Sequence, residues 1–187
     1  MVEERQVIES FLLARTDETF CALFETVCVR LRRYFLLRGL DAATAEDLTQ
    51  NVFVKVYQHA GELREPDHFY GWLFAIARNE MVSYWRREPP ALERVEAEEL
   101  SGRQAHGLWK ESEEAPALRV TELLQTLEPA ERDLVVLRFV EGLSYEELAA
   151  ALKLPMGTVK WRIFNARKKL SRAAGTSRTL RARENVN

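Results

Sequence analysis

The sequence predicts an all-α protein of two small helical domains joined by a flexible linker, the second domain being a helix-turn-helix. Apolar residues recur at three- and four-residue spacing in long segments, which is typical of amphipathic helices, and no segment alternates as a half-buried strand would. From residue 88 to residue 116 this spacing gives way to Pro, Gly and acidic residues. We therefore expect one domain at residues 1–87, an acidic linker at 88–116, a second domain at 117–171 and a basic tail at 172–187.

The first domain is expected to open with a helix over residues 17–38, ended by Gly39 in the position that glycine usually takes after a helix. Cys21 and Cys28 lie on this helix seven positions apart, so at ~1.5 Å per residue they are roughly 10 Å from each other. That separation is too long for a disulfide. We expect both cysteines to be small buried apolar residues.

The second expected helix, over residues 42–60, has two unlike faces. One face should be core, and its members are Ala45, Leu48, Val52, Val56 and His59. The opposite side carries Phe53, Val54 and Tyr57 beside Asp47 and Gln50, which is too apolar for a solvent face. It is either buried against a neighbouring helix or exposed as a surface for a protein partner.

The third expected helix, over residues 69–87, follows a loop at residues 61–68 and ends in Arg86 and Arg87. Its six aromatic residues exceed what one apolar stripe can bury; they are Phe69, Tyr70, Trp72, Phe74, Tyr84 and Trp85. Most should be core. A surplus of stacking side chains flanked by arginines is also typical of proteins that bind single-stranded nucleic acid.

Helical spacing returns at residues 117–127, and three further helices follow, separated by short turns. Pro129 suits the first turn of the first of them, and Gly142 the turn after it. Ser144 and Glu147 form a capping box that should open the next helix. The last helix should then bury one apolar stripe against its predecessor and leave the other side free.

Charge is divided unevenly along the chain although its net value is only −2. Residues 117–187 carry 13 Lys or Arg against eight Asp or Glu, and residues 153–183 hold ten bases and no acid. Such local basicity is the electrostatic footprint of nucleic-acid binding. The tail at 172–187 lacks a core pattern, and we expect it to be disordered near DNA phosphates.

The free side of the last helix has the residue types that read the DNA major groove. Arg162 can form a bidentate pair with guanine and Asn165 with adenine, while the Thr158 methyl or the Trp161 ring can meet a thymine methyl. The basic side chains around them suit contacts to DNA phosphates. The expected DNA-binding set is Thr158, Lys160, Trp161, Arg162, Asn165, Lys168 and Lys169.

Three motifs in order resemble the bacterial sigma-70 family, specifically its short extracytoplasmic-function (ECF) group. They are "AEDLTQNVFVKVY", "FYGWLFAIARNEMVSYWRR" and "LEPAERDLVVLRFVEGLSYEELAAALKLPMGTVKWRIFNARKKL". The resemblance implies a factor that binds core RNA polymerase, recognises promoter DNA, opens the duplex and starts transcription. It also implies control by an anti-sigma factor, which in this family is often membrane-bound.

The resemblance assigns roles residue by residue. Docking on core polymerase falls on Asp47, Leu48, Gln50, Phe53 and Tyr57. Recognition and melting of the minus-ten element, as duplex and opened strand, fall on Phe69, Trp72, Asn79, Arg86 and Arg87. The minus-thirty-five element falls to the face from Thr158 to Lys169. Three positions depart from the family pattern: Asn51, Ser83 and Pro155.

Two other functions are weighed against this one. An autonomous repressor or activator would explain the last helices but leaves the aromatic helix and the two-faced helix without a role. An enzyme is disfavoured, because the sequence has no Gly-rich phosphate loop, metal-ligand cluster or paired nucleophile and base. We expect no cofactor, a monomer when free of partners, and a cytoplasmic protein, since the first residues do not resemble a signal peptide.

Overall fold

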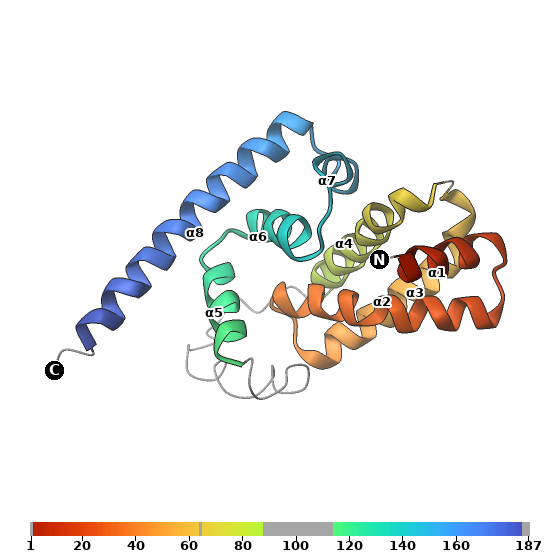
Figure 1. Cartoon of the computed structure of the whole chain (residues 1–187), viewed down its shortest axis with the longest axis horizontal. Helices are drawn as coiled ribbons and strands as arrows, with labels where there is room; N and C mark the ends of the chain where they lie inside the picture. The colour runs from red at the N-terminus through yellow and green to blue at the C-terminus, as the bar shows by residue number, and fades with distance from the viewer. Residues whose placement is uncertain (1, 64, 88–113, 185–187) are drawn as a thin grey trace.

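A computed structural model describes residues 2–63, 65–87 and 114–184, and all regular structure in these ranges is helical (Figure 1). The N-terminal domain contains α1 (Val2–Leu13), α2 (Asp17–Leu37), α3 (Ala42–His59) and α4 (Phe69–Arg87), with the short 3-10 turns η1 (Ala60–Glu62) and η2 (Pro66–His68) before α4. The C-terminal domain contains α5 (Glu114–Gln125), α6 (Pro129–Val135), the π-helical turn η3 (Val136–Val140), α7 (Tyr145–Leu152) and α8 (Met156–Glu184). The all-α prediction is confirmed.

Local capping signals explain where most helices begin. The Asp41 carboxylate accepts the Thr44 backbone N–H at 2.9 Å and so caps α3. In the predicted capping box of α7, Glu147 N–H donates to Ser144 Oγ at 3.1 Å and Ser144 N–H donates to Glu147 Oε2 at 2.8 Å. Gly39 ends α2 with a φ of +91°, a value that only glycine adopts without strain.

Helix α1 was not predicted. Its Ile8 and Phe11 are buried, and the helix packs on α2 and on η2. Glu4 holds it in place: its carboxylate accepts hydrogen bonds from the Arg30 guanidinium at 3.0 Å and from the Tyr70 hydroxyl. These partners lie 26 and 66 residues away in the chain, so local spacing could not indicate them.

Several other expectations need correction. Helix α5 starts at Glu114, three residues before the expected start, and the rest of the predicted linker lies outside the described residues. The expected disorder after residue 171 is wrong as far as Glu184, because α8 continues through it. Cys21 is exposed and Cys28 half-buried, both as free thiols, so neither is a core residue. His59 is also exposed and lies 2.8 Å from Glu62 Oε1.

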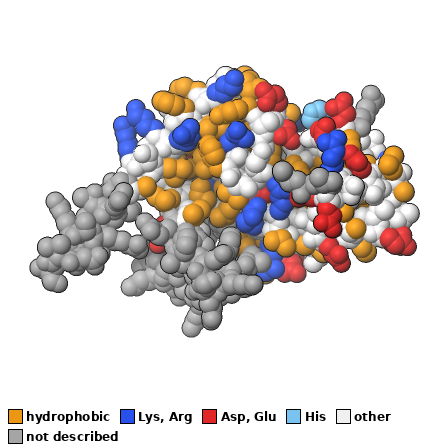
Figure 2. All heavy atoms as spheres, in the orientation of Figure 1, with side chains coloured by type: hydrophobic (Ala, Val, Ile, Leu, Met, Phe, Trp, Pro, Cys, Tyr) orange, Lys and Arg blue, Asp and Glu red, His pale blue; other side chains and the backbone are white. Residues whose placement is uncertain are grey.

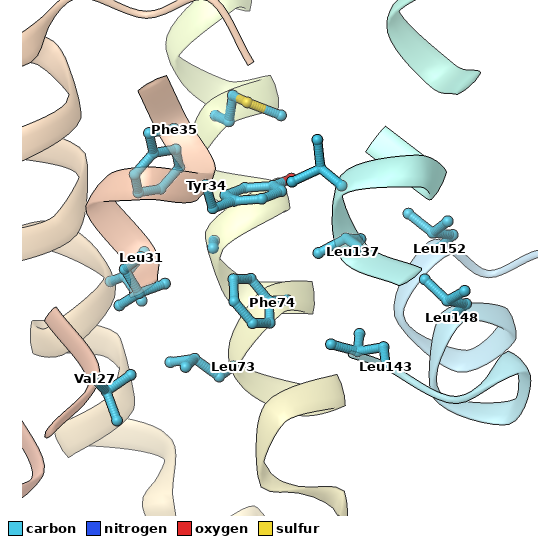
Figure 3. Packing of buried hydrophobic residues seen from close by; sticks show 14 of the residues in the cluster. Val27, Leu31, Tyr34, Phe35, Leu73, Phe74, Leu137, Leu143, Leu148 and Leu152 are labelled. Atoms are coloured by element: carbon cyan, nitrogen blue, oxygen red, sulfur yellow. The ribbon is translucent and has the colours of Figure 1, made fainter. Parts of the chain in front are cut away.

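The two domains share one continuous hydrophobic core, with α4 at its centre (Figure 3). Val27, Leu31, Tyr34 and Phe35 of α2 lie on one side of Leu73 and Phe74, and Leu137, Leu143, Leu148 and Leu152 of the C-terminal domain lie on the other. Helix α4 packs closely on both α3 and α7. The sequence predicts two domains but gives no sign that they pack together.

Candidate nucleic-acid interface

The turn between α7 and α8 builds a helix-turn-helix. Lys153 ends α7 in the left-handed region with a φ of 52°, and Leu154 N–H donates to the Ala149 carbonyl at 3.0 Å. Val159 N–H donates to the Pro155 carbonyl at 3.1 Å, so Pro155 stands at the entrance to α8, where its missing N–H has no helical partner to lose. Val159, Ile163 and Ala166 are buried, as the periodicity predicts.

The other side of α8 is the reading face, which we define as Thr158, Lys160, Trp161, Arg162, Asn165, Lys168 and Lys169. Trp161 is 64% exposed, while Thr158, Arg162 and Asn165 are half-buried beside it. The Lys160 ammonium lies 5.8 Å from the Tyr145 ring centroid, and Lys169 Nζ lies 2.8 Å from Glu131 Oε2. The reading face therefore presents the indole ring of Trp161, with polar side chains beside it and lysines at its edges.

Phe164, on the same helix, is 65% exposed, and Phe139 of η3 is 54% exposed. Sequence periodicity did not single out either ring as a surface residue. Helix α8 itself projects beyond the rest of the fold (Figure 1). On the face drawn in Figure 2, acidic side chains gather over the N-terminal domain, whereas basic and apolar side chains dominate over α6 to α8.

The second predicted contact region, on α4, is divided between core and surface. Asn79, Arg86 and Arg87 are exposed and Trp72 is half-buried, so all four can reach a ligand. Phe69 cannot, because its side chain is fully buried; its ring lies 6.2 Å from the Trp72 ring and supports it from below. Phe69 is therefore a core residue in this structure, which corrects its expected role as a direct contact.

Tyr70, next to this region, is held by two neighbours. The Arg30 guanidinium lies 4.0 Å from its ring centroid, and its hydroxyl donates to the Glu4 carboxylate. Burial and this hydrogen bond raise the pKa of Tyr70 far above its usual value. Burial alone would raise the pKa of Glu4, but hydrogen bonds from Tyr70 and the charge of Arg30 outweigh it and leave that pKa lowered.

The second apolar side of helix α3 is partly buried against a neighbouring helix and partly exposed, so each of the two expected alternatives holds for some of its residues. Phe53 is buried against α2, with its ring 4.7 Å from that of Phe24, and Leu48 is buried too. Neither can touch a partner in this conformation. Asp47, Gln50 and Tyr57 stay exposed, and Val54 is 54% exposed.

An apolar strip remains at the surface between α2 and α3. The Tyr57 ring, 48% exposed, lies 5.4 Å from the Phe20 ring, and Phe24 on α2 is 38% exposed. We call Phe24, Val54 and Tyr57, with the adjoining Asp47 and Gln50, the α2–α3 surface.

Other kinds of site find little support in the described part of the chain. It contains no group of three or more His, Cys, Asp and Glu side chains placed to hold a metal ion. None of its helices combines the length and the apolar character that crossing a bilayer requires.

Two family descriptions match the chain, one to each domain. "Sigma-70 region 2" matches residues 23–89, and "Sigma-70, region 4" matches residues 117–170. The first match covers most of α2 and all of α3 and α4. The second match covers the helix-turn-helix.

Full-length relatives agree with these matches. The RNA polymerase sigma-H factor of Pseudomonas aeruginosa is 37% identical over 145 residues, which is 71% of this chain and 74% of the relative. The ECF RNA polymerase sigma-E factor of Escherichia coli is 32% identical over 176 residues, which is 87% of this chain and 92% of the relative.

Two solved structures share the fold. CnrH in complex with the cytosolic domain of CnrY aligns with a TM-score of 0.67 at 24% identity, over 93% of this chain and 98% of that one. The sigma factor RpoE of Bartonella quintana, in complex with the anti-sigma factor NepR, aligns with a TM-score of 0.62 at 24% identity, over 82% and 94%.

Proposed function

The chain belongs to the extracytoplasmic-function group of the sigma-70 family, and from this premise we propose that it binds core RNA polymerase and directs promoter-specific transcription initiation. The observation that carries the proposal is the pair of exposed nucleic-acid surfaces on separate domains, the reading face of α8 and the exposed side chains of α4. An autonomous regulator needs only the first of them.

The reading face of α8 is assigned to the minus-thirty-five element as duplex DNA. Arg162 and Asn165 lie on one side of the helix with Trp161, where a guanine, an adenine and a thymine methyl can be contacted in the major groove. The exposed Lys160 and Lys168 hold the phosphates and fix the register. Lys169 joins them by exchanging Glu131 for a phosphate.

The exposed side chains of α4 are assigned to the minus-ten element. Trp72 offers a ring for an unstacked base, Asn79 offers an amide for a base edge, and Arg86 and Arg87 offer charge for the backbone at the end of the helix. Flipping a base into a protein costs a few kcal/mol, which stacking and edge contacts offset. Opening of the duplex therefore requires no chemical step, and we assign the chain no catalytic role and no cofactor.

The α2–α3 surface is assigned to docking on core polymerase. Its exposed aromatic and aliphatic side chains are flanked by Asp47 and Gln50, the mixture of apolar anchor and polar rim that protein interfaces use. We further propose that an anti-sigma factor, membrane-bound or free, holds the chain inactive, as the Bartonella quintana factor is found with NepR. The free chain is then a monomer that works in the cytoplasm, where polymerase and chromosome are.

Run-off transcription with purified core polymerase and a library of promoter fragments tests the proposal. Arg162→Ala should remove a guanine contact worth about 1–3 kcal/mol and reduce initiation about 5- to 150-fold on promoters with the preferred base, relaxing selectivity there. Asn79→Ala should reduce initiation without changing duplex binding through α8.

The matched control for Arg162→Ala is Arg167→Ala, an exposed arginine on the same helix that is not assigned to a base contact. It should weaken initiation to a similar small extent on every promoter. Sequence-specific binding of the chain alone, with no transcript in the presence of core polymerase, would establish the autonomous regulator instead.

A further inference from the structure

Two buried acidic residues of the C-terminal domain are bound by basic residues of the N-terminal domain. The Glu141 side chain is fully buried just after η3. Arg30 Nε donates to its Oε2 at 3.1 Å, and Arg33 Nη2 donates to its Oε1 at 2.9 Å. Arg30 Nη2 also donates to the Glu141 backbone carbonyl at 2.7 Å, so main chain and side chain are both held from α2.

Asp133 of α6 is held in the same way about one turn further along α2. The Tyr34 hydroxyl donates to its Oδ1 at 2.7 Å, and Arg78 Nε of α4 donates to its Oδ2 at 3.1 Å. Arg38 Nε lies 3.4 Å from Oδ1, and Arg38 Nη1 donates to the Pro129 carbonyl at 2.7 Å. Both carboxylates thus have charged partners that all come from the other domain.

A glycine allows the backbones to approach beside these pairs. A Cβ on Gly71 of α4 would lie 3.1 Å from both Cβ and Cγ of Glu147 in α7. Glu147 cannot move aside freely, because its carboxylate accepts the Ser144 N–H in the capping box. A methyl group at residue 71 would therefore require Glu147, or the two helices, to shift by a few tenths of an ångström.

The closed arrangement is too small for the function proposed above. The centres of the minus-ten and minus-thirty-five elements are ~25 base pairs apart, or about 85 Å at ~3.4 Å per pair. A compact chain of this length has a radius of gyration of about 16 Å. The two domains are joined by 26 residues, and a chain of that number spans at most about 90 Å, so the number of residues permits the domains to separate.

We propose that the free chain closes on itself and is inactive in that state, with Glu141 and Asp133 as the latch between its domains. The proposal rests on the proposed function, because closure matters only for a protein that must contact two distant DNA elements. Binding to core polymerase then requires opening, and the apparent affinity for polymerase is reduced in proportion to the fraction of open chains. Weakening the latch should therefore increase that affinity.

The charged groups of the latch make closure specific and reversible. The carboxylates are the buried partners, so removal of an arginine leaves a buried negative charge without its counter-charge, which disfavours the closed state. In the open state, by contrast, the arginines and both carboxylates are hydrated again, which lowers the cost of separating the domains. A purely apolar contact would offer no such compensation.

The interdomain distance in the full chain is the first test. One label is placed on the exposed Cys21 in a Cys28→Ser background and another on the exposed position 150 through Ala150→Cys, and spin-label distances are recorded without partners. The wild-type latch should give a single short distance. Glu141→Gln, which removes the charge that Arg30 and Arg33 contact, should raise the opening equilibrium constant about tenfold or more and add a long-distance population. Gly71→Ala, which adds a methyl group at the contact, should also raise this constant and add that population.

Two matched controls accompany these variants. Glu146→Gln alters an exposed carboxylate of α7, and Gly157→Ala adds a methyl where no atom lies within 4 Å. Both should keep the short distance. A long distance already in the wild type, or an unchanged distance in both latch variants with retained helical circular dichroism, would overturn the proposal.

Titration of core polymerase separates this idea from the function it rests on. Glu141→Gln should bind core polymerase with a lower apparent Kd and initiate more transcription at limiting polymerase. Changed distances with no transcript from any variant would refute the proposed function and leave the latch standing. Normal transcription with unchanged distances and unchanged Kd would refute the latch alone.

Discussion

The hydrogen bond from Tyr34 to Asp133 provides the sharpest test of the interface energetics. Tyr34→Phe removes one hydroxyl and leaves the ring packing in place, so little cavity is created. The lost bond is 2.7 Å long, fully buried, and made to a carboxylate. Hydrogen bonds to charged groups contribute about 1.5–3 kcal/mol, and Asp133 keeps Arg78 as a donor. We expect a loss of about 2 kcal/mol in the free energy of unfolding.

Urea and thermal unfolding followed by circular dichroism measure this loss. For a chain of this size about 2 kcal/mol corresponds to a fall in Tm of about 4–8 °C. In an Asp133→Asn background the acceptor is neutral, and the cost of Tyr34→Phe should fall to about 1 kcal/mol. Tyr57→Phe, at a half-exposed ring, is the control and should stay within about 0.5 kcal/mol. An equal cost in both backgrounds would refute the charge-assisted bond.

Two further predictions concern local structure. Ser144→Ala should lower the free energy of unfolding, measured in urea, by about 1 kcal/mol because it removes the α7 cap. Ser171→Ala, at an exposed helical position, is the control and should not lower it. Equal effects of the two substitutions would show that the cap is not formed. Acid should release α1, because the lowered pKa of Glu4 means that its ionised form stabilises the fold. That contribution is complete above the ordinary value of about 4.3 and is lost as the pH falls through the lowered pKa. NMR shifts of α1 amides should follow this loss, and Glu4→Gln should abolish the pH dependence.

Local signals allowed much of the fold to be predicted. Asp41, Gly39 and Ser144 determine helix ends through bonds within a few residues, so the positions of α2, α3 and α7 follow from short stretches of sequence. The buried stripe of α8 follows from spacing alone, and its free face was predicted with it. The candidate nucleic-acid interface on α8 is therefore the part of the molecule that sequence describes best.

Long-range contacts explain what could not be predicted. Arg30 and Arg33 look like the solvent face of a helix, yet their partner Glu141 is 111 and 108 residues away. The family resemblance assigned Phe53 to a partner surface, whereas periodicity left burial against a neighbouring helix open, and the structure buries Phe53 against Phe24 of α2. Helix α1 was within reach of prediction, because Ile8, Phe11 and Leu12 have helical spacing, but its packing on α2 and η2 depends on distant contacts.

The composition of the domain interface argues that it is made to separate. An obligate contact gains most from apolar residues, and replacing buried ion pairs by hydrophobic residues is often neutral or stabilising. Here two carboxylates and their arginines occupy positions that Leu or Met could fill, beside the apolar side chains of Leu137, Leu143 and Leu148. Compared with a purely apolar interface, such an interface stabilises the closed state less. It also exposes fewer apolar groups to water when the domains separate. On opening, Arg33 and Arg38 of α2 and Arg78 of α4 would lose their carboxylate partners, whereas Arg30 would keep Glu4. Opening would then leave uncompensated positive charge on α2 and α4.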